Sequence, residues 1–192
     1  MLFLESHPLK PFLPSNAKVL MLGSFPPQQK RWSMDFFYPN YQNDMWRIMG
    51  LLFFADKDIF VDRDAKSFHK NAIIQFLEET GIALYDTAEV VRRLRDNASD
   101  IYLEIVQPTN LETLLQHIPF CEAIVTTGEK ATNEIITHYQ TAKPPIGAYA
   151  SLQIGQRKLR LYRMPSSSRA YPLALDKKAF YYHEMFKDLG II

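Results

Sequence analysis

Short apolar runs that each begin or end beside a glycine constrain the fold more than any other feature of this sequence. The run Ala17–Gly23 is typical of a buried strand that leads into a tight turn. Similar runs occur at Ile82–Tyr85, which follows Gly81, and at Cys121–Thr127, which precedes Gly128. Helical patterns separate these runs. The alternation predicts an α/β protein with an open, mostly parallel sheet covered by helices on both faces.

The expected helices have helical periodicity, together with start signals such as Asn43-Asp44 or closing glycines. They span residues 45–52, 67–80, 110–117, 129–139 and 173–189. Two late apolar segments, 152–154 and 159–164, predict a strand pair. Between residues 86 and 109 the notable feature is a basic cluster, which we interpret as a solvated face before a polar turn at 96–100. This cluster consists of Arg92, Arg93 and Arg95.

Composition limits the classes of protein to which the chain can belong. Its 192 residues are 47% hydrophobic and 22% charged, which indicates a single globular domain over residues 1–192 and excludes general disorder. Lysine and arginine total 22 against 21 acidic residues, for a net charge of +1. Any contact with nucleic acid must therefore depend on a local basic patch.

The cysteine count, the spacing of the histidines and the length of the apolar runs exclude further classes of protein. A lone Cys121 cannot form a disulfide within the chain or supply an iron–sulfur cluster, and the five histidines lack metal-ligand spacing, so we expect no metal and no cofactor. No apolar run approaches the ~20 residues that span a bilayer. The N-terminus MLFLESHPLKPFLP lacks a basic region and a sustained apolar core, so we expect a cytoplasmic protein with no membrane association.

Ligands of doubly wound sheets bind beyond the carboxyl ends of the strands, and the loops expected there contain the candidate chemistry. Gly23-Ser24-Phe25-Pro26-Pro27 could hold an anionic or carbonyl group through backbone N–H groups, although, taken alone, the loop is better explained as an ordinary turn after a buried strand. The aromatic stretch Phe36–Trp46 could stack a base and, through Asn43, hold a water. Alternatively, its rings are core and Asn43 is a helix cap.

A third loop, Met164–Ala170, is rich in hydroxyl groups and could bind phosphate with Arg169, or could simply be an exposed connection. The order of the three motifs, Gly-Ser-Phe-Pro, then Asn-x-x-Trp, then Pro-Ser-Ser-Ser, resembles the uracil-DNA glycosylase superfamily. The similarity covers about residues 18–186 and is greatest to the hypoxanthine (deoxyinosine) and mismatch-specific branch. It implies a three-layer αβα sandwich around a mainly parallel four-stranded sheet.

The resemblance also implies an activity, the hydrolysis of the N-glycosidic bond of a deaminated or mismatched base in DNA, and a set of site residues. By position, Asn43 corresponds to the catalytic amide of the hypoxanthine branch, and Tyr38 to the ring that stacks on the extruded base. Ser168 and Arg169 would contact DNA. The residues that would bind the base are Gly23, Ser24, Phe25, Pro26, Tyr38, Ser166 and Ser167.

Several departures from the family pattern affect the expected mechanism. Pro27 stands where a second glycine is common, which removes one backbone donor, and Met45 replaces the usual phenylalanine. No histidine precedes Pro165 to stabilise the leaving base. The first motif lacks an acidic residue, and Asp35 and Asp44 are the candidate general bases near Asn43. Alternatively, Asp44 stabilises the N-terminus of the following helix electrostatically.

Three functional hypotheses follow. The first is a monomeric, monofunctional DNA glycosylase for hypoxanthine or uracil, and the second a non-catalytic nucleic-acid or nucleotide-binding module on the same fold. The third, a small-molecule hydrolase or transferase, ranks last because the sequence has no Gly-x-Ser-x-Gly elbow, Cys–His pair or P-loop. For DNA, the expected phosphate contacts are Lys30, Arg31, Arg92, Arg93, Arg95, Arg163 and Arg169.

Overall fold

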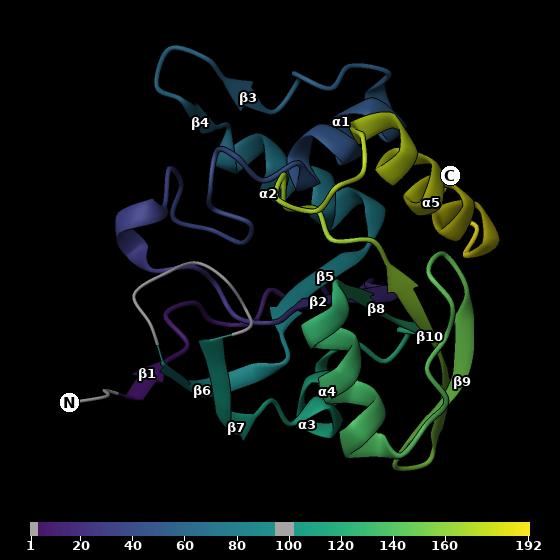
Figure 1. Ribbon diagram of the computed structural model, residues 1–192. Helices are drawn as coiled ribbons and strands as arrows, with labels where there is room; N and C mark the ends of the chain where they lie inside the picture. Colours follow the sequence, from purple (N-terminus) through teal and green to yellow (C-terminus); the bar gives the residue numbers. More distant parts are fainter. Residues whose placement is uncertain (1–3, 95–101) are drawn as a thin grey trace.

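The central sheet has five strands in the order β5-β2-β8-β10-β9 (Figure 1). The computed structural model describes residues 4–94 and 102–192, so Arg95 and the expected turn at 96–100 lie outside the described residues. Four strands run parallel, and β9 pairs antiparallel with β10. The strands are β2 (Val19–Gly23), β5 (Ile82–Asp86), β8 (Ala123–Thr127), β9 (Tyr149–Ile154) and β10 (Arg157–Met164). The mainly parallel sheet is confirmed, with β9 as a fifth strand beyond the expected four.

Helices cover both faces of this sheet, which confirms the three-layer αβα architecture. Figure 1 shows α1, α2 and α5 on one face and α3 and α4 on the other. The helices are α1 (Met45–Phe54), α2 (Lys70–Thr80), α3 (Leu111–His117), α4 (Glu129–Tyr139) and α5 (Leu175–Asp188). The predicted start of α2 at Ser67 was wrong, because β4 (Ser67–Phe68) pairs with β3 (Val61–Asp62).

A second, antiparallel sheet lies beside the sandwich and was not predicted. It has the order β1-β6-β7 and consists of β1 (Leu4–Ser6), β6 (Ala88–Arg93) and β7 (Leu103–Pro108). Its β6 contains two of the three arginines that we assigned to a solvated face. That assignment was wrong for Arg93, which is 8% exposed and ion-paired with Glu5, 2.9 Å away. Arg92 does lie at the surface, paired with Glu104.

The core explains why the strand sequences are almost uniformly apolar. Every residue of β2, β5 and β8 is buried, as expected for parallel strands covered on both faces. On one face, α1 contributes Met45 and Trp46, both fully buried. Cys121 is also buried, and its burial raises the pKa of the thiol to about 11. Among the described residues, no helix has the length and hydropathy needed to cross a membrane.

Candidate active site

Three neighbouring strands end together at one edge of the sheet, and a cavity opens beyond their ends. The register of β2 and β5 places Gly23 beside Asp86, and β8 ends at Thr127 on the other side of β2. These three residues line a cavity of about 510 Å3. Its volume falls within the range of roughly 300–1,000 Å3 that is usual for small-molecule pockets. The sheet topology therefore creates a site at the edge where parallel α/β sheets bind ligands.

All ten site residues named from the sequence line this one cavity, although they come from three distant segments. Their common location does not by itself assign their roles, which remain predictions. From the first strand and its loop come Gly23, Ser24, Phe25 and Pro26; from the aromatic segment, Tyr38 and Asn43; and from the last loop, Ser166, Ser167, Ser168 and Arg169.

The loop after β2 is fixed by hydrogen bonds to its carbonyl oxygens. The Thr87 N–H donates to the Gly23 oxygen at 2.9 Å, and Arg93 donates to the Pro26 oxygen at 2.7 Å. The indole N–H of Trp32 holds the Pro27 oxygen at 2.6 Å. Arg93, the buried arginine of the second sheet, thus supports the cavity loop. The second sheet, which was not predicted, therefore helps to shape the site.

Tyr38 forms one wall of the cavity in a strained backbone conformation. Its φ of 49° lies in the left-handed region, which residues other than glycine rarely adopt and which is often found at functional sites. The ring stands edge-on to Trp46, with centroids 5.9 Å apart, and the hydroxyl lies 3.0 Å from Thr127 Oγ1. Burial raises the pKa of the phenol, the Thr127 hydrogen bond partly offsets that rise, and the Asp86 carboxylate adds to it. The Tyr38 hydroxyl is therefore neutral at physiological pH.

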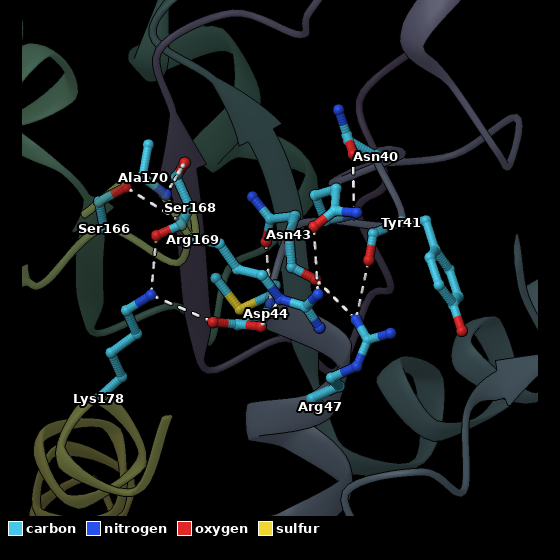
Figure 2. A network of polar contacts seen from close by, with 12 residues as sticks. Asn40, Tyr41, Asn43, Asp44, Arg47, Ser166, Ser168, Arg169, Ala170 and Lys178 are labelled. Atoms are coloured by element: carbon cyan, nitrogen blue, oxygen red, sulfur yellow. Dashed lines mark hydrogen bonds and ion pairs between the residues drawn. The ribbon is translucent and has the colours of Figure 1, made fainter. Parts of the chain in front are cut away.

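Asn43 lies just before α1 and lines the cavity, but it is not the N-cap that its sequence position suggested, because that residue is Asp44. Its Oδ1 accepts a hydrogen bond from the Met45 N–H at 2.9 Å, so the side chain closes a turn at the start of α1. Because a backbone N–H can only donate, the amide atom facing it must be oxygen. Nδ2 is thus left without a hydrogen-bond partner among the described residues, and Asn43 lines the cavity. Figure 2 shows Asn43 between the Asn40–Tyr41 segment and Ser168, with which its backbone forms a β-bridge.

A partly buried ionic network connects the last loop to the start of α1 (Figure 2). The Asp44 carboxylate accepts from Arg169 Nε at 2.9 Å and from Lys178 Nζ at 3.2 Å. Lys178 is fully buried and also donates to the Ser168 oxygen at 2.8 Å. The Asp44 N–H donates to the Ser167 oxygen at 2.9 Å. This network holds two walls of the cavity in a fixed relation.

The two carboxylates suggested as general bases are not in the cavity. Asp35 is exposed and does not line it. Asp44 is held by two cations and lines a neighbouring cleft instead. The suggestion was wrong because nearness to Asn43 in the sequence does not bring a side chain into the cavity: Asp35 points to solvent, and Asp44 belongs to the neighbouring cleft.

Asp86 is a cavity residue that the sequence interpretation missed. It is the carboxylate that lines the cavity among the described residues, and its Oδ2 lies 2.8 Å from His7 Nε2. The position of Asp86 at the end of a predicted strand was a usable signal. That of His7 was not, since 79 residues separate the two. Within residues 4–94 and 102–192, no group of three histidine, cysteine or acidic side chains could hold a metal ion.

Comparisons with known proteins support the fold. No protein-family model matches the chain, and no curated protein matches its sequence. Its structure is similar to the solution NMR structure of a "putative Uracil DNA glycosylase" from Methanosarcina acetivorans, with a TM-score of 0.60 and 18% sequence identity. The similarity covers 94% of this chain and 98% of that one. The chain therefore has a uracil-DNA glycosylase-like fold, as the motif order implied.

Proposed function

We propose that this protein is a monofunctional DNA glycosylase that hydrolyses the N-glycosidic bond of a deaminated or mismatched base, either hypoxanthine or uracil. One observation carries the proposal. The three sequence motifs, far apart in the chain, converge on a single cavity with an aromatic wall, a free amide nitrogen and a hydroxyl-rich rim. The name of the structural neighbour supports the class of activity, and the Asn-x-x-Trp motif supports the hypoxanthine branch.

The cavity suits a base that has left the DNA stack. Extruding a nucleotide costs a few kcal/mol and costs least at a mismatch or a damaged pair, so weakly paired bases enter preferentially. Phe25 and Tyr38 line the cavity, and aromatic rings offset the lost stacking. The fixed loop after β2 would face the base as negative charge develops on it during bond cleavage.

Asn43 would position the attacking water. Its free Nδ2 can donate to one lone pair of the water oxygen and leave the other lone pair for attack on the sugar carbon. A neutral amide cannot remove a proton from water strongly. Positioning is nevertheless effective, because the sugar has oxocarbenium character once the base begins to leave, and such a centre reacts with a weak nucleophile.

The rim residues Ser166–Arg169 would contact the DNA backbone near the extruded nucleotide. With a net charge of +1, duplex affinity should be modest and should fall as salt is raised. Arg93 and Arg163 form ion pairs with Glu5 and Glu129. Fewer of the phosphate contacts expected from the sequence are therefore available to DNA.

The test is an excision assay on duplexes that contain uracil, hypoxanthine or a single mismatch, followed by alkaline cleavage at abasic sites. The Asn43→Ala variant should cut about 100-fold more slowly, the usual effect of removing one positioning group. Asn110→Ala is the matched control, because Asn110 caps α3 through the Thr113 N–H but lies outside the cavity. It should cut at the wild-type rate.

Two results would contradict the proposal. Binding to a lesion duplex without strand breaks would identify the non-catalytic module instead. Neither binding nor cleavage of any duplex would reject both hypotheses. Circular dichroism of Asn43→Ala confirms that a lost rate does not reflect lost folding.

A further inference from the structure

The cleft beside the cavity holds an excess of positive charge. It has a volume of about 680 Å3. The charged side chains that line it are Arg47, Lys57, Arg63, Arg169 and Lys178 on one side of the balance and Asp44 and Asp58 on the other. The whole chain has a net charge of only +1. The cleft is therefore a local concentration of cations, which attracts anions.

Both carboxylates of the cleft already have partners. Asp44 belongs to the network described above, and Asp58 pairs with Arg63. Among the described residues, neither Arg47 nor Lys57 has an acidic partner within ion-pair distance. These two cations therefore supply charge that the cleft itself does not neutralise.

Arg47 is a buried cation, only 6% exposed, that is held by neutral groups. Its Nη1 donates to the Tyr41 oxygen at 3.0 Å and to the Asn43 oxygen at 3.2 Å (Figure 2). The rings of Tyr41 and Phe68 lie 4.8 Å and 5.4 Å from its Cζ. Its Nε and Nη2 have no acceptor among the described residues. Carbonyl groups and rings orient the guanidinium, but they do not neutralise it as a buried charge requires.

The electrostatic surroundings of Arg47 favour an anion. Burial lowers the pKa of its guanidinium, and the positive charge of Arg169 lowers that pKa further, while Tyr41 and Asp44 offset part of the shift. The guanidinium still keeps its proton, because arginine is not deprotonated in proteins. An anion bound in the cleft would therefore reduce both the cost of burying this charge and its repulsion by Arg169.

We propose that the cleft binds a phosphate group, held by the Arg47 guanidinium and the Lys57 ammonium. The planar fork of arginine matches two phosphate oxygens, and lysine adds a flexible point charge. The phosphate belongs either to a nucleic-acid strand or to free inorganic phosphate. Because Arg169 lines both the cleft and the cavity, a strand whose base enters the cavity would pass near the cleft. The inference does not depend on the proposed function.

Isothermal titration calorimetry with inorganic phosphate, at an ionic strength kept constant with chloride, tests the site. The wild-type protein should bind phosphate saturably. Lys57→Gln should raise the dissociation constant about tenfold, the effect of losing one hydrogen bond to a charged group. Lys57 is exposed, so this variant should fold. Lys158→Gln is the matched control, because Lys158 is exposed and lies at the opposite end of β10 from the cavity, and it should bind as the wild type does.

Arg47→Lys tests the buried cation. The variant keeps the charge but removes the fork, so it should also bind phosphate about tenfold more weakly. Thermal unfolding shows whether it folds, and if it does not, Lys57→Gln decides the question alone. A folded Arg47→Lys protein with wild-type affinity for phosphate would contradict the role of Arg47.

Binding to an undamaged duplex distinguishes the two sources of phosphate. If the phosphate belongs to a DNA strand, Lys57→Gln should weaken duplex binding and lower the slope of log affinity against log salt by about one. If it is free phosphate, Lys57→Gln should weaken phosphate binding and leave duplex affinity unchanged. The inference is overturned if Lys57→Gln changes neither affinity. Neither measurement uses excision, so the glycosylase assignment is tested separately.

Discussion

The cavity beyond the ends of β2, β5 and β8 and the charged cleft beside it share Arg169 but differ in how their polar groups are satisfied. The cavity presents Asp86 Oδ1 and the Asn43 amide nitrogen without partners among the described residues. In the cleft, both carboxylates are paired: Asp44 with Arg169 and Lys178, and Asp58 with Arg63. Unsatisfied polar atoms on a rigid wall are available to a ligand, whereas satisfied ones hold structure. The cavity should therefore govern activity, and the cleft stability.

The largest effect should come from the cleft. Lys178→Met leaves the buried Asp44 carboxylate with Arg169 as its remaining partner and should lower the free energy of unfolding by about 3 kcal/mol. Urea denaturation measures this change. The double variant Asp44→Asn/Lys178→Met removes both charges and should recover part of the loss, since no uncompensated carboxylate stays buried. A loss below about 1 kcal/mol in the single variant would mean that Lys178 does not hold the loop.

Gly23→Ala tests the cavity with a change of one methyl group. The new Cβ would meet Asp86 Oδ1 at 2.4 Å, so the carboxylate that His7 holds must move. We expect a cost of about 2 kcal/mol in unfolding free energy, typical of overpacking, and a far larger relative effect on excision, about 100-fold. If excision falls only in proportion to the unfolded fraction, the conclusion that the cavity governs activity and the cleft stability would be wrong.

Tyr38→Phe should have a smaller effect, because it removes one hydrogen bond, to Thr127, worth about 1 kcal/mol. Its signature is a pH dependence. Burial raises the Tyr38 pKa above the ordinary value of 10.0, so the unfolded chain loses this proton first as pH rises. Wild-type stability due to this group is full below pH 10.0 and declines above it, whereas the variant should decline less. Urea denaturation at pH 8 and at about pH 10.5 compares the two slopes.

The smallest effect should follow from Arg63→Ala, at the rim of the cleft. The Arg63 side chain is 73% exposed, and its ion pair with Asp58 spans 2.5 Å. Exposed pairs gain little because water screens them and two side chains must be ordered. Thermal unfolding and excision should both match the wild type. A clear destabilisation would show that the cleft depends on its surface charges as well as on Lys178.

Local pattern predicted most of the sandwich but not the second sheet. Strands β2, β5 and β8 and the helices that separate them were recognised because apolar runs, helical periodicity and glycine caps are properties of neighbouring residues. Pairing of β1 with β6 joins Leu4 to Arg92 and has no local signal. Arg93 was assigned to the surface for the same reason, since its burial depends on Glu5 and on the Pro26 oxygen.

The site residues that belong to sequence motifs could be predicted. Those that come together only through the pairing of distant segments could not. Asn43, Tyr38 and the Ser166–Arg169 loop were named from the sequence, and they line one cavity. The His7–Asp86 contact was missed because His7 reaches the end of β5 only through the pairing of β1 with β6, which has no local signal. Only the structure shows which polar atoms lack a hydrogen-bond partner, and therefore that Asn43 presents a nitrogen and Asp86 an oxygen to the cavity.

The single cysteine gives this protein a practical advantage for testing whether a base enters the cavity. Cys121 is buried, and its thiol stays protonated well above neutral pH because burial raises its pKa to about 11. Maleimide dyes should therefore spare it in the native protein. A cysteine substituted for the exposed Ala170 at the cavity rim would then be the selective attachment point for a fluorophore. Stopped-flow emission from such a conjugate could time nucleotide entry independently of bond cleavage.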